Sequence, residues 1–421
     1  MALSCGRDGW GERLHHHPKS LGLGEESMKS IRLGVIALHP IQYQDILWET
    51  LYRLSLGSGI EVEVIFLDKI GLNPVRVADF NTTLDFKDVI RLNYPHKFLM
   101  NLSPLKEHIF LGRVNPGILR EVLKYDVLLL HSINHVSYQL AFFLAKLLGK
   151  KVMIRGEGTP GKARSRLVKY LKKIYFKYMD LVFYSCSGNK HYFKDFSVSD
   201  DKLRFLPCAV DNDYFRTKYL ELSRKRATLR KNLGIENNDL VILFVGRFVD
   251  IKRPMDILKA IDLLIHKKNL QNLKALFIGG GPFEKDMTAF VKSKGLTKNV
   301  IMKGFVKQSK IVEYYALADI FVLPSSVDRS PKVLNEAMNF ELPVITTNVI
   351  GTAELVKERY NGFKIAVGDV LALADRISIL ASDSNLRHTF GKNSWAVVKD
   401  WNFERDAKAI LDGVRELCLS K

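Results

Sequence analysis

The chain has few cysteines for its length, and they are far apart. Only four occur in 421 residues, at Cys5, Cys186, Cys208 and Cys418, and no two form a Cys-x-x-Cys pair. A zinc cluster or a disulfide framework is therefore not expected. Widely spaced thiols are typical of buried free cysteines in a reducing compartment, so the sequence predicts a cytoplasmic protein.

Long apolar runs are also missing. The most apolar helical stretch, Val136 to Leu148, is interrupted by Gln139 and Lys146 and is too short to cross a bilayer. Residues 1–27 contain no apolar core, so they do not resemble a signal peptide. We expect them to form a disordered extension and the folded part to start at about Met28.

Acidic residues are outnumbered: 45 Asp and Glu face 64 Lys and Arg, which leaves a net charge of +19. Such an excess favours anionic partners, namely phosphates, nucleic acid or a lipid surface. No zinc, helix-turn-helix or RNP-like pattern accompanies the charge, so we expect no nucleic acid partner. Hydrophobic residues make up 47% of the chain, which excludes wholesale disorder.

Apolar runs of strand length alternate with helical patterns in the first half of the chain. This alternation predicts a parallel sheet covered by helices on both faces. The predicted strands are Ile31–Leu38, Glu61–Leu67, Asp126–His131, Lys151–Ile154 and Leu181–Cys186, with helices at Val136–Leu148 and Leu167–Tyr178.

Residues 207–239 interrupt this rhythm with a charged stretch that has no strand pattern. A second series follows, with strands at Leu240–Val245, Leu273–Ile278, Val300–Met302, Ile320–Leu323 and Pro343–Thr346. We therefore predict an α/β protein of two tandem Rossmann-like domains that face each other across a cleft. Neither half carries the Gly-x-Gly-x-x-Gly dinucleotide fingerprint, which argues against a dehydrogenase.

Two cations follow the first strand of the second domain. Gly246 and Arg247 come directly after Leu240–Val245, and Lys252 follows five residues later. Open parallel sheets bind ligands at the carboxyl ends of their strands, and arginine and lysine both bind phosphate oxygens. The sequence thus predicts a phosphate site here; the alternative is a pair of solvated surface cations.

A second cluster follows the strand at Ile320–Leu323. Ser330 and Pro331 predict a helix start, with serine at the N-cap and proline at N1, so free backbone N–H groups would face the cleft. Asp328 precedes this helix and Glu336 lies within it. We expect their carboxylates to be on the order of 10 Å apart, too far for a retaining glycosidase pair and suited to holding hydroxyls at two ends of one ligand.

These motifs, in this order, resemble family 4 of the glycosyltransferases, retaining enzymes of the GT-B fold that use nucleotide sugars. The resemblance covers about 160 residues, through Phe244–Lys252, Ile278–Pro282, Gly304–Val306, Pro324–Met338, Gly351-x-x-Glu354 and Asn361-Gly362. It is thinner in the first half, where His39–Tyr43 and Val210-Asp211 with Phe215 carry it. It implies an acceptor-side domain over 28–212, a donor domain over 213–395, and a C-terminal helix, 396–421, that packs back on the first domain.

The resemblance also implies roles for individual residues. Arg247 and Lys252 would hold the donor diphosphate and neutralise the leaving group, while Asp328 and Glu336, the two acidic positions of the family's motif, would bind the sugar and the ribose hydroxyls. Members of the family need no metal or other cofactor, because cations and a helix dipole take that part. The remaining donor-binding positions would be Gly246, Gly281, Phe305, Val306, Ser330, Pro331, Lys332 and Val333.

Several positions depart from the family pattern. Asp328 replaces the usual glutamate, Arg329 and Ile350 stand where glycine is common, and Cys208-Ala209 stands where Asn-Gly is typical. In the first domain, many relatives have a histidine facing the sugar where this chain reads Ile154-Arg155-Gly156-Glu157-Gly158. Either Arg155 or Glu157 acts there, or the site is built otherwise.

His131 and His135 flank the end of a predicted strand, and His131 is a further candidate for polarising a hydroxyl. The alternative for it is a structural imidazole bonded to a loop carbonyl. Asp211-Asn212-Asp213 matches a metal-binding Asp-x-Asp pattern, but it lies in the connection between the domains, so we expect no metal there.

Residues Lys162 to Lys177 contain seven basic residues and no acidic one. A helical wheel puts Leu167, Leu171, Ile174 and Tyr178 on one face and the cations on the other, with Phe176 among the cations. A solvated basic face is one interpretation. The other is a helix that lies on an anionic membrane, at its inner face, and so meets a lipid-linked acceptor.

The sequence therefore predicts a retaining glycosyltransferase that moves a sugar from a nucleotide-diphosphate sugar to a hydroxyl of a glycan or lipid-linked glycan, in polysaccharide or glycoconjugate biosynthesis. The alternatives are a nucleotide-sugar epimerase or hydrolase of the same fold and a non-catalytic basic-surface binding protein.

Overall fold

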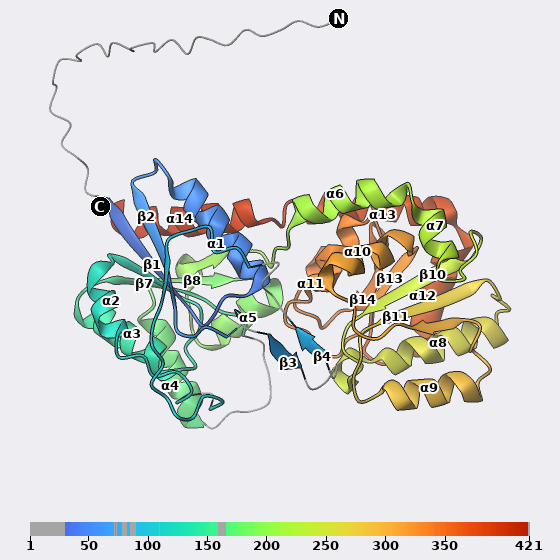
Figure 1. The fold of residues 1–421 in the computed structure, drawn as a ribbon, viewed down its shortest axis with the longest axis horizontal. Helices are drawn as coiled ribbons and strands as arrows, with labels where there is room; N and C mark the ends of the chain where they lie inside the picture. Colours follow the sequence, from blue (N-terminus) through green and yellow to red (C-terminus); the bar gives the residue numbers. More distant parts are fainter. Residues whose placement is uncertain are drawn as a thin grey trace, which may run out of the picture.

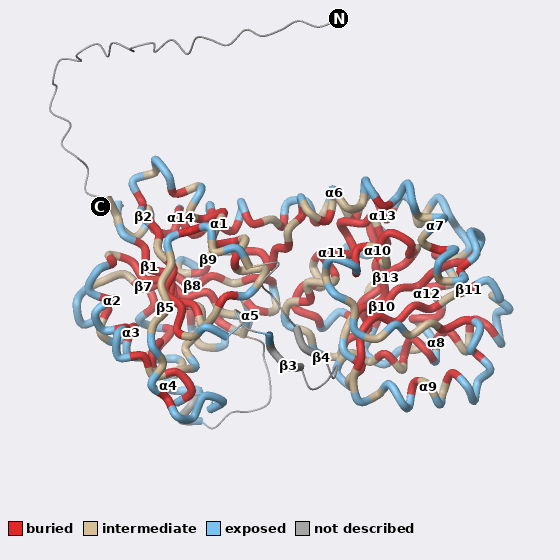
Figure 2. The backbone as a smooth tube through the Cα atoms, in the orientation of Figure 1, coloured by how far each residue is buried: buried red, intermediate tan, exposed pale blue. Residues whose placement is uncertain are grey.

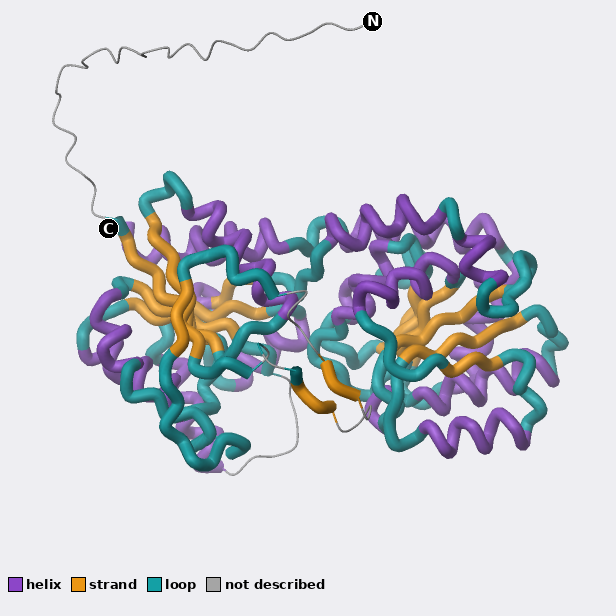
Figure 3. Tube along the Cα trace, viewed as in Figure 1, coloured by secondary structure: helices purple, strands orange, loops and turns teal. Residues whose placement is uncertain are grey.

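The computed structural model describes residues 30–419 apart from positions 71, 73, 78–81, 85–89, 109 and 159–165. The predicted extension, residues 1–27, falls outside the described residues. The chain forms two α/β lobes that lie side by side (Figure 1). Each lobe is built around one parallel sheet with helices on both faces (Figure 3).

The first sheet has seven strands in the order β5-β2-β1-β6-β7-β8-β9, and every neighbouring pair is parallel. Its strands are β1 (Ile31–Ala37), β2 (Ile60–Phe66), β5 (His96–Phe98), β6 (Val127–Leu130), β7 (Lys151–Arg155), β8 (Leu181–Tyr184) and β9 (Leu203–Phe205). Helices α1 (Gln42–Ser55), α2 (Ile118–Lys124), α3 (Val136–Leu147), α4 (Arg166–Lys177) and α5 (Ser187–Asp195) belong to this domain. The described part of the segment between β2 and β5 adds an antiparallel pair of short strands, β3 (Val75–Val77) and β4 (Thr82–Leu84).

The second sheet has six parallel strands in the order β12-β11-β10-β13-β14-β15. Its strands are β10 (Leu240–Val245), β11 (Leu273–Ile278), β12 (Val300–Met302), β13 (Ile320–Leu323), β14 (Val344–Thr347) and β15 (Gly362–Ile365). Its helices are α6 (Asn212–Ser223), α7 (Arg226–Lys231), α8 (Pro254–His266), α9 (Glu284–Ser293), α10 (Gln308–Leu317), α11 (Lys332–Asn339), α12 (Val370–Ser382) and α13 (Ser384–Val398). The predicted fold class is confirmed.

Both sheets reverse their strand order at one point, between β1 and β6 in the first and between β10 and β13 in the second. Loops that leave the carboxyl ends of such strands diverge and open a crevice, which is where open α/β sheets bind ligands. The segment His39–Tyr43 and His131 follow the first pair of strands. Gly246-Arg247 and the 324–331 loop follow the second pair, so the motifs chosen from the sequence lie at both switch points.

The strands are the most buried part of each lobe (Figure 2). In β10 all six residues are buried, and in β6 all four are. A strand covered on both faces needs apolar residues at every position instead of at alternate ones. The continuous apolar runs of the sequence therefore predicted these strands closely.

The chain crosses between the two lobes twice. At the first crossing, Leu206 and Ala209 pack in the core of the first domain, whereas Cys208 and Val210 pack in that of the second. At the second crossing, the terminal helix α14 (Phe403–Leu419) packs on the first sheet and on α1. The predicted terminal helix, 396–421, begins too early, because residues 396–398 still belong to α13 and the chain crosses at about Trp401.

One side-chain amide ties the two crossings together. Asn212 donates to the carbonyl oxygens of Val398 at 3.1 Å and Trp401 at 3.2 Å, and accepts from Asn339 Nδ2 at 2.8 Å. Asn212 is buried, so these bonds are shielded from water and hold the two connecting segments at a fixed distance.

The predicted orientation of α4 is wrong. Phe176, assigned to the cationic face, is 2% exposed and packs edge-on against Phe193 of α5, whereas Leu171 and Tyr178, assigned to the inward face, are more than half exposed. The helix carries two apolar stripes, and the aromatic stripe gains more from burial because its rings pack on the α5 aromatics. Lys162 and the side chain of Leu167 lie outside the described residues.

Candidate active site

Three strand ends of the second sheet are joined by backbone hydrogen bonds. The amide of Gly246 donates to Ile278 at 3.0 Å, and that of Gly279 donates to Gly304 at 2.8 Å. A Cβ on Gly279 would lie 1.9 Å from the carbonyl oxygen of Gly246, and its φ is +138°. Only glycine allows this approach and this conformation, so the Gly279-Gly280-Gly281 run shapes the floor of the site.

Lys252 and Asp328 form an ion pair above this floor. Lys252 ends a short 3₁₀ turn after β10, and Asp328 lies in the loop after β13, so the pair bridges the switch point. Their side chains are 19% and 13% exposed. The structure thus brings together two of the residues predicted from separate motifs, while Arg247 lies exposed at the end of β10.

The loop after β13 is held from two sides. Ser326 donates its amide to the carbonyl oxygen of Ile251 at 2.9 Å, and Gly351 donates to that of Asp328 at 2.7 Å. A Cβ on Gly351 would lie 1.7 Å from the carbonyl oxygen of Arg329, which explains why glycine remains at 351 although Ile350 replaces its usual neighbour. The backbone at Asp328 is therefore fixed by contacts on both flanks.

The predicted N-cap of α11 is wrong by one residue. Pro331 is the N-cap and Lys332 the first helical residue, and Ser330 directs its hydroxyl to the Cys208 thiol. Pro331 makes no side-chain cap, so the backbone N–H groups of the first turn of α11 receive no bond from a capping side chain. This is the helix end that the sequence assigned to ligand binding.

Glu336 is buried and accepts hydrogen bonds on both carboxylate oxygens. Tyr315 of α10 donates to Oε2 at 2.8 Å, and Tyr43 of the first domain donates to Oε1. Burial raises the pKa of Glu336, while the two hydroxyls oppose that shift. Burial and the neighbouring carboxylate in turn raise the pKa of both tyrosines, so each keeps its proton as a donor.

The other predicted donor-side positions lie on the segments that follow β11, β12 and β13. Lys332 donates to the carbonyl oxygen of Ala209 at 2.9 Å, and Val333 packs on the second core. Phe305 is 37% exposed and Val306 half-buried in the segment after β12, and Gly281 is half-buried after β11. These residues come from segments that follow neighbouring strands of one sheet.

The first domain contributes a buried polar group that the sequence did not single out. Asp406 of α14 is fully buried, and Arg155 lies 4.0 Å from it. Burial raises the pKa of Asp406 to about 7, although Arg155, Lys332 and Arg405 act in the opposite direction. Of the two candidates for the missing histidine, Arg155 is buried in this cluster and Glu157 is exposed.

His131 lies beside the same cluster. Its ring packs edge-on against Trp48 with 5.0 Å between centroids, and its Nε2 has no hydrogen-bond partner within the described part of the chain. Burial and the nearby Arg155 lower the pKa of His131, so the ring is neutral at physiological pH. Among the described residues, therefore, no loop carbonyl accepts a hydrogen bond from His131 Nε2, as the alternative of a structural imidazole would require at that atom.

Further contacts cross the interface beside the donor loop. Glu354, from the Gly351-x-x-Glu354 motif, accepts from the amide of Ser187 at the start of α5 at 3.0 Å. Cys186 lies 3.9 Å from the carbonyl oxygen of Arg329, and burial raises the pKa of its thiol to about 11. The motif residue therefore joins the domains in this structure, and the thiol stays protonated.

Asp211, the first acid of the Asp-x-Asp pattern, is the N-cap of α6. Its side chain accepts from the amide of Tyr214 at 3.0 Å, and Asp213 points to solvent. Helix capping is an ordinary role for aspartate at this position and accounts for the pattern.

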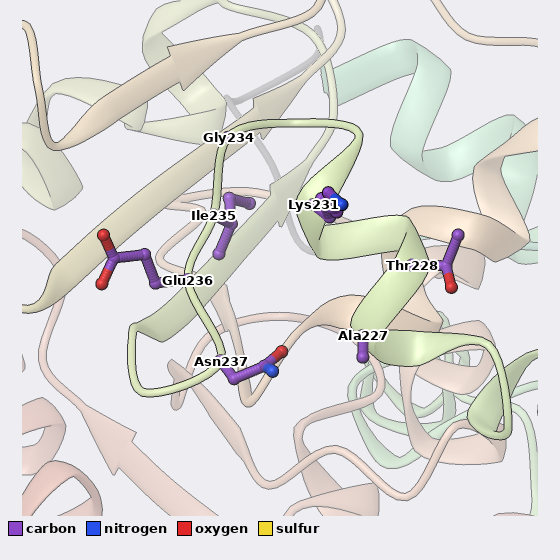
Figure 4. A pocket seen from close by; sticks show the side chains of 7 residues that line it. All are labelled: Ala227, Thr228, Lys231, Gly234, Ile235, Glu236 and Asn237. Atoms are coloured by element: carbon purple, nitrogen blue, oxygen red, sulfur yellow. The ribbon is translucent and has the colours of Figure 1, made fainter.

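A surface hollow beside α7 lies at the other end of the second sheet. Its lining residues are Ala227, Thr228, Lys231, Gly234, Ile235, Glu236 and Asn237 (Figure 4). Glu236 and Thr228 lie on opposite sides of it. Because it sits before β10 and the Lys252–Asp328 pair lies after β10, it is not part of the candidate site.

Residues 225–396 match the family model described as Glycosyl transferases group 1. An N-acetylgalactosaminyltransferase of Campylobacter jejuni, named for an undecaprenol-diphosphate-linked acceptor, is 28% identical over 56% of this chain and 60% of its own length. A UDP-Gal:GlcNAc-diphosphoundecaprenol galactosyltransferase of Escherichia coli is 22% identical over 88% of this chain and 94% of its own. Against the first three curated relatives, the chain spans only about half of their length.

The crystal structure of Anabaena HepE in complex with UDP superimposes with a TM-score of 0.71 at 16% identity, over 92% of this chain and 100% of HepE. At that identity the likeness establishes the fold, which is the GT-B fold. The predicted pair of facing Rossmann-like domains is therefore confirmed.

Proposed function

Residues 225–396 of this chain belong to the glycosyl transferases group 1, and from this premise we propose that the protein is a retaining glycosyltransferase. It moves a sugar from a nucleotide-diphosphate sugar to a hydroxyl of a glycan or lipid-linked glycan. The observation that carries the proposal is the convergence of Lys252, Asp328 and the glycine floor at the switch point of the second sheet.

The proposed donor lies with its diphosphate against Lys252 and Arg247 and with its sugar toward Asp328. Lys252 is paired with Asp328 in the structure, so diphosphate binding draws the ammonium toward phosphate oxygens and leaves the Asp328 carboxylate to accept from sugar hydroxyls. The amino end of α11 adds uncapped N–H groups to the same side. We propose that these charges let the leaving group depart without a metal.

The configuration of the sugar is proposed to be kept by a front-face route. In this route the acceptor hydroxyl attacks from the side of the departing diphosphate, and a donor phosphate oxygen takes its proton. The two acidic positions of the motif have other partners, since Glu336 is buried beside two tyrosines and Asp328, paired with Lys252 here, is proposed to accept from the sugar hydroxyls. Neither is arranged as a free nucleophile.

The acceptor is proposed to be lipid-linked. The Campylobacter and Escherichia relatives are both named for acceptors on undecaprenyl diphosphate, and the Escherichia relative matches across the first domain as well as the second. None of the described helices is both long enough and apolar enough to cross a bilayer. A chain of this kind reaches a lipid-linked acceptor from the membrane surface, and we propose the inner, cytoplasmic face of the membrane.

One side of the first domain carries many exposed apolar side chains, as a membrane-contacting surface requires. Exposed apolar side chains lie on single faces of α2, α3 and α4 and in the segment before α2, and Leu147 and Met100 are 83% and 78% exposed. The three helices are neighbours on one side of the first lobe (Figure 1): α2 packs on α3, and the Phe142 ring of α3 lies 4.0 Å from that of Tyr175 on α4. This membrane face comprises Met100, Leu102, Leu105, Phe110, Leu119, Leu123, Leu140, Phe143, Leu147, Tyr170, Leu171, Ile174 and Tyr178.

Cations accompany these apolar side chains. Arg166, Lys169, Lys173 and Lys177 are exposed on α4, interleaved with Leu171 and Ile174. An apolar face with cations beside it matches an anionic bilayer, because apolar side chains enter the acyl boundary while the cationic groups stay with the headgroups. The basic segment Lys162–Lys177 is thus proposed to act with α2 and α3 instead of alone.

The membrane proposal predicts selective binding to anionic vesicles. The protein is expected to float with phosphatidylglycerol vesicles and not with phosphatidylcholine vesicles. The double variant Phe143→Ser/Leu147→Ser is expected to weaken this binding about tenfold or more, since two exposed apolar side chains no longer enter the bilayer. Leu371→Ser, at an equally exposed leucine on α12 of the other domain, is the control and should bind as wild type. Unchanged flotation of the double variant would contradict the proposed face.

The donor proposal predicts that one nucleotide stabilises the protein. Thermal unfolding with UDP, GDP and ADP should show a rise in Tm for one of them, because a ligand at 100 times its Kd adds about 2.7 kcal/mol to stability. Arg247→Ala and Lys252→Ala should lose that rise, whereas Lys259→Ala, an exposed lysine on α8, should keep it. If none of the three nucleotides stabilises the folded wild type, the transferase proposal is wrong. Sugar release to water alone, with no acceptor product, would favour a hydrolase.

A further inference from the structure

A tyrosine of the first domain donates a hydrogen bond to the buried carboxylate of the second domain. Tyr43 lies in the first turn of α1, after the β1 switch-point loop, and its hydroxyl donates to Glu336 Oε1. Gln308 Nε2 donates to the same hydroxyl at 3.0 Å, and Lys332 Nζ lies 5.7 Å from the ring centroid. Three side chains of the donor domain thus hold one residue of the other domain, 293 positions away in the chain from Glu336.

This contact uses the group that the proposed function assigns to the donor's ribose. A ribose hydroxyl and a tyrosine hydroxyl present the same chemistry to a carboxylate, one O–H donor at about 2.7 Å. Glu336 is only 3% exposed, so a ribose cannot reach it while both of its oxygens are covered.

We propose that Tyr43 competes with the ribose of the donor nucleotide for Glu336, so that donor binding displaces Tyr43 and changes the contact between the domains. The inference rests on the proposed function, because it takes Glu336 as the ribose acceptor. It assigns to the His39–Tyr43 segment of the acceptor-side domain a part in donor binding.

Of the two tyrosines on Glu336, Tyr43 is the less buried one, and it packs only at the edge of the two cores. Tyr315 is fully buried, belongs to α10 of the same domain and stacks on Phe340 at 5.5 Å between ring centroids. Tyr43 is half-buried at the start of its helix, where the N-cap residue, Ile41, makes no side-chain capping bond. Movement of the first domain, or of the α1 start, removes Tyr43 from Glu336 and leaves Tyr315 in place.

The test is the affinity of the full chain for UDP, GDP and ADP and for their 2′,3′-dideoxy forms, measured by titration calorimetry on wild type, Tyr43→Phe and Tyr315→Phe. Tyr43→Phe keeps the ring and removes the competing hydroxyl. It is expected to tighten binding of the recognised ribonucleotide about 10- to 150-fold, the range of one hydrogen bond to a charged group, and to leave the dideoxy form within about twofold. Tyr315→Phe, which removes a donor that does not compete, is the matched control and should not tighten binding.

Each other result overturns the inference. Equal or weaker ribonucleotide binding by Tyr43→Phe would mean that the hydroxyl does not compete, and equal tightening of the dideoxy form would mean that the gain does not come through Glu336. These outcomes leave the proposed function standing, since wild type still binds a nucleotide. Absence of binding to all three nucleotides in both wild type and Tyr43→Phe would contradict the proposed function and the inference together.

Discussion

Lys252→Ala is expected to lower kcat/KM for the nucleotide sugar by about 10²- to 10³-fold. In the proposed reaction, negative charge grows on the leaving diphosphate, and Lys252 is held at that point by the strand end and by Asp328. Removing one preorganised partner of a developing charge typically costs that much. The measurement is steady-state turnover of whichever nucleotide sugar corresponds to the stabilising nucleotide, with Lys259→Ala as the control.

Asp328→Asn separates the two members of the pair. It is expected to slow turnover as well, because an amide is a weaker partner for the sugar hydroxyls, but to bind the free nucleoside diphosphate at least as tightly as wild type. Lys252 no longer has to leave a carboxylate in order to reach phosphate. Turnover at the wild-type level in Lys252→Ala, or loss of nucleotide affinity in Asp328→Asn, would show that the diphosphate binds elsewhere.

Asp406→Asn is expected to change how the stability of the protein depends on pH. Burial raises the pKa of Asp406 from 3.8 to about 7, so between these values the folded state holds a proton that the unfolded state has lost. A buried carboxyl of this kind destabilises the folded state least at low pH, where it is protonated in both states. The free energy of unfolding then falls as the pH rises from the unfolded pKa to the folded pKa. The asparagine variant lacks this titration.

Between pH 5 and pH 8 the unfolding free energy of Asp406→Asn should therefore rise relative to wild type by about 2 to 3 kcal/mol. Urea unfolding at the two pH values measures it. Asp412→Asn, on the exposed side of the same helix, should follow the wild-type curve. Parallel curves for Asp406→Asn and wild type would mean that Asp406 is ionised throughout, held by Arg155.

The parts of the fold that the sequence predicted are those that local pattern determines. The central strands are apolar at every position, and glycine, lysine and aspartate at strand ends indicated the second switch point. The short edge strands His96–Phe98 and Leu203–Phe205 were not predicted, because three residues at a sheet edge carry no apolar run. The error at Phe176 has a similar origin, since α4 has two apolar stripes and only the α5 aromatics decide which one is buried.

The contacts that complete the site depend on how the domains meet. Tyr43 was noted only as part of a motif, and nothing near it in the chain indicates a bond to Glu336. Asp406 lies on the buried side of an amphipathic helix, and the sequence alone does not indicate that Arg155 is its neighbour. Both contacts join residues that are hundreds of positions apart in the chain. They form only because of where the fold places α1 and α14.

The double attachment of Asn212 restricts how the domains can move. The amide keeps the two connecting segments adjacent where they leave the second lobe, so both crossings lie at one place between the lobes. The contacts of Tyr43 and Glu354 are separate from the bonds of this amide and can break while those bonds stay intact. Two crossings at one place favour rotation of the lobes about that place over their separation, so Lys252 and Asp328 stay on the side of the second lobe that faces the first domain.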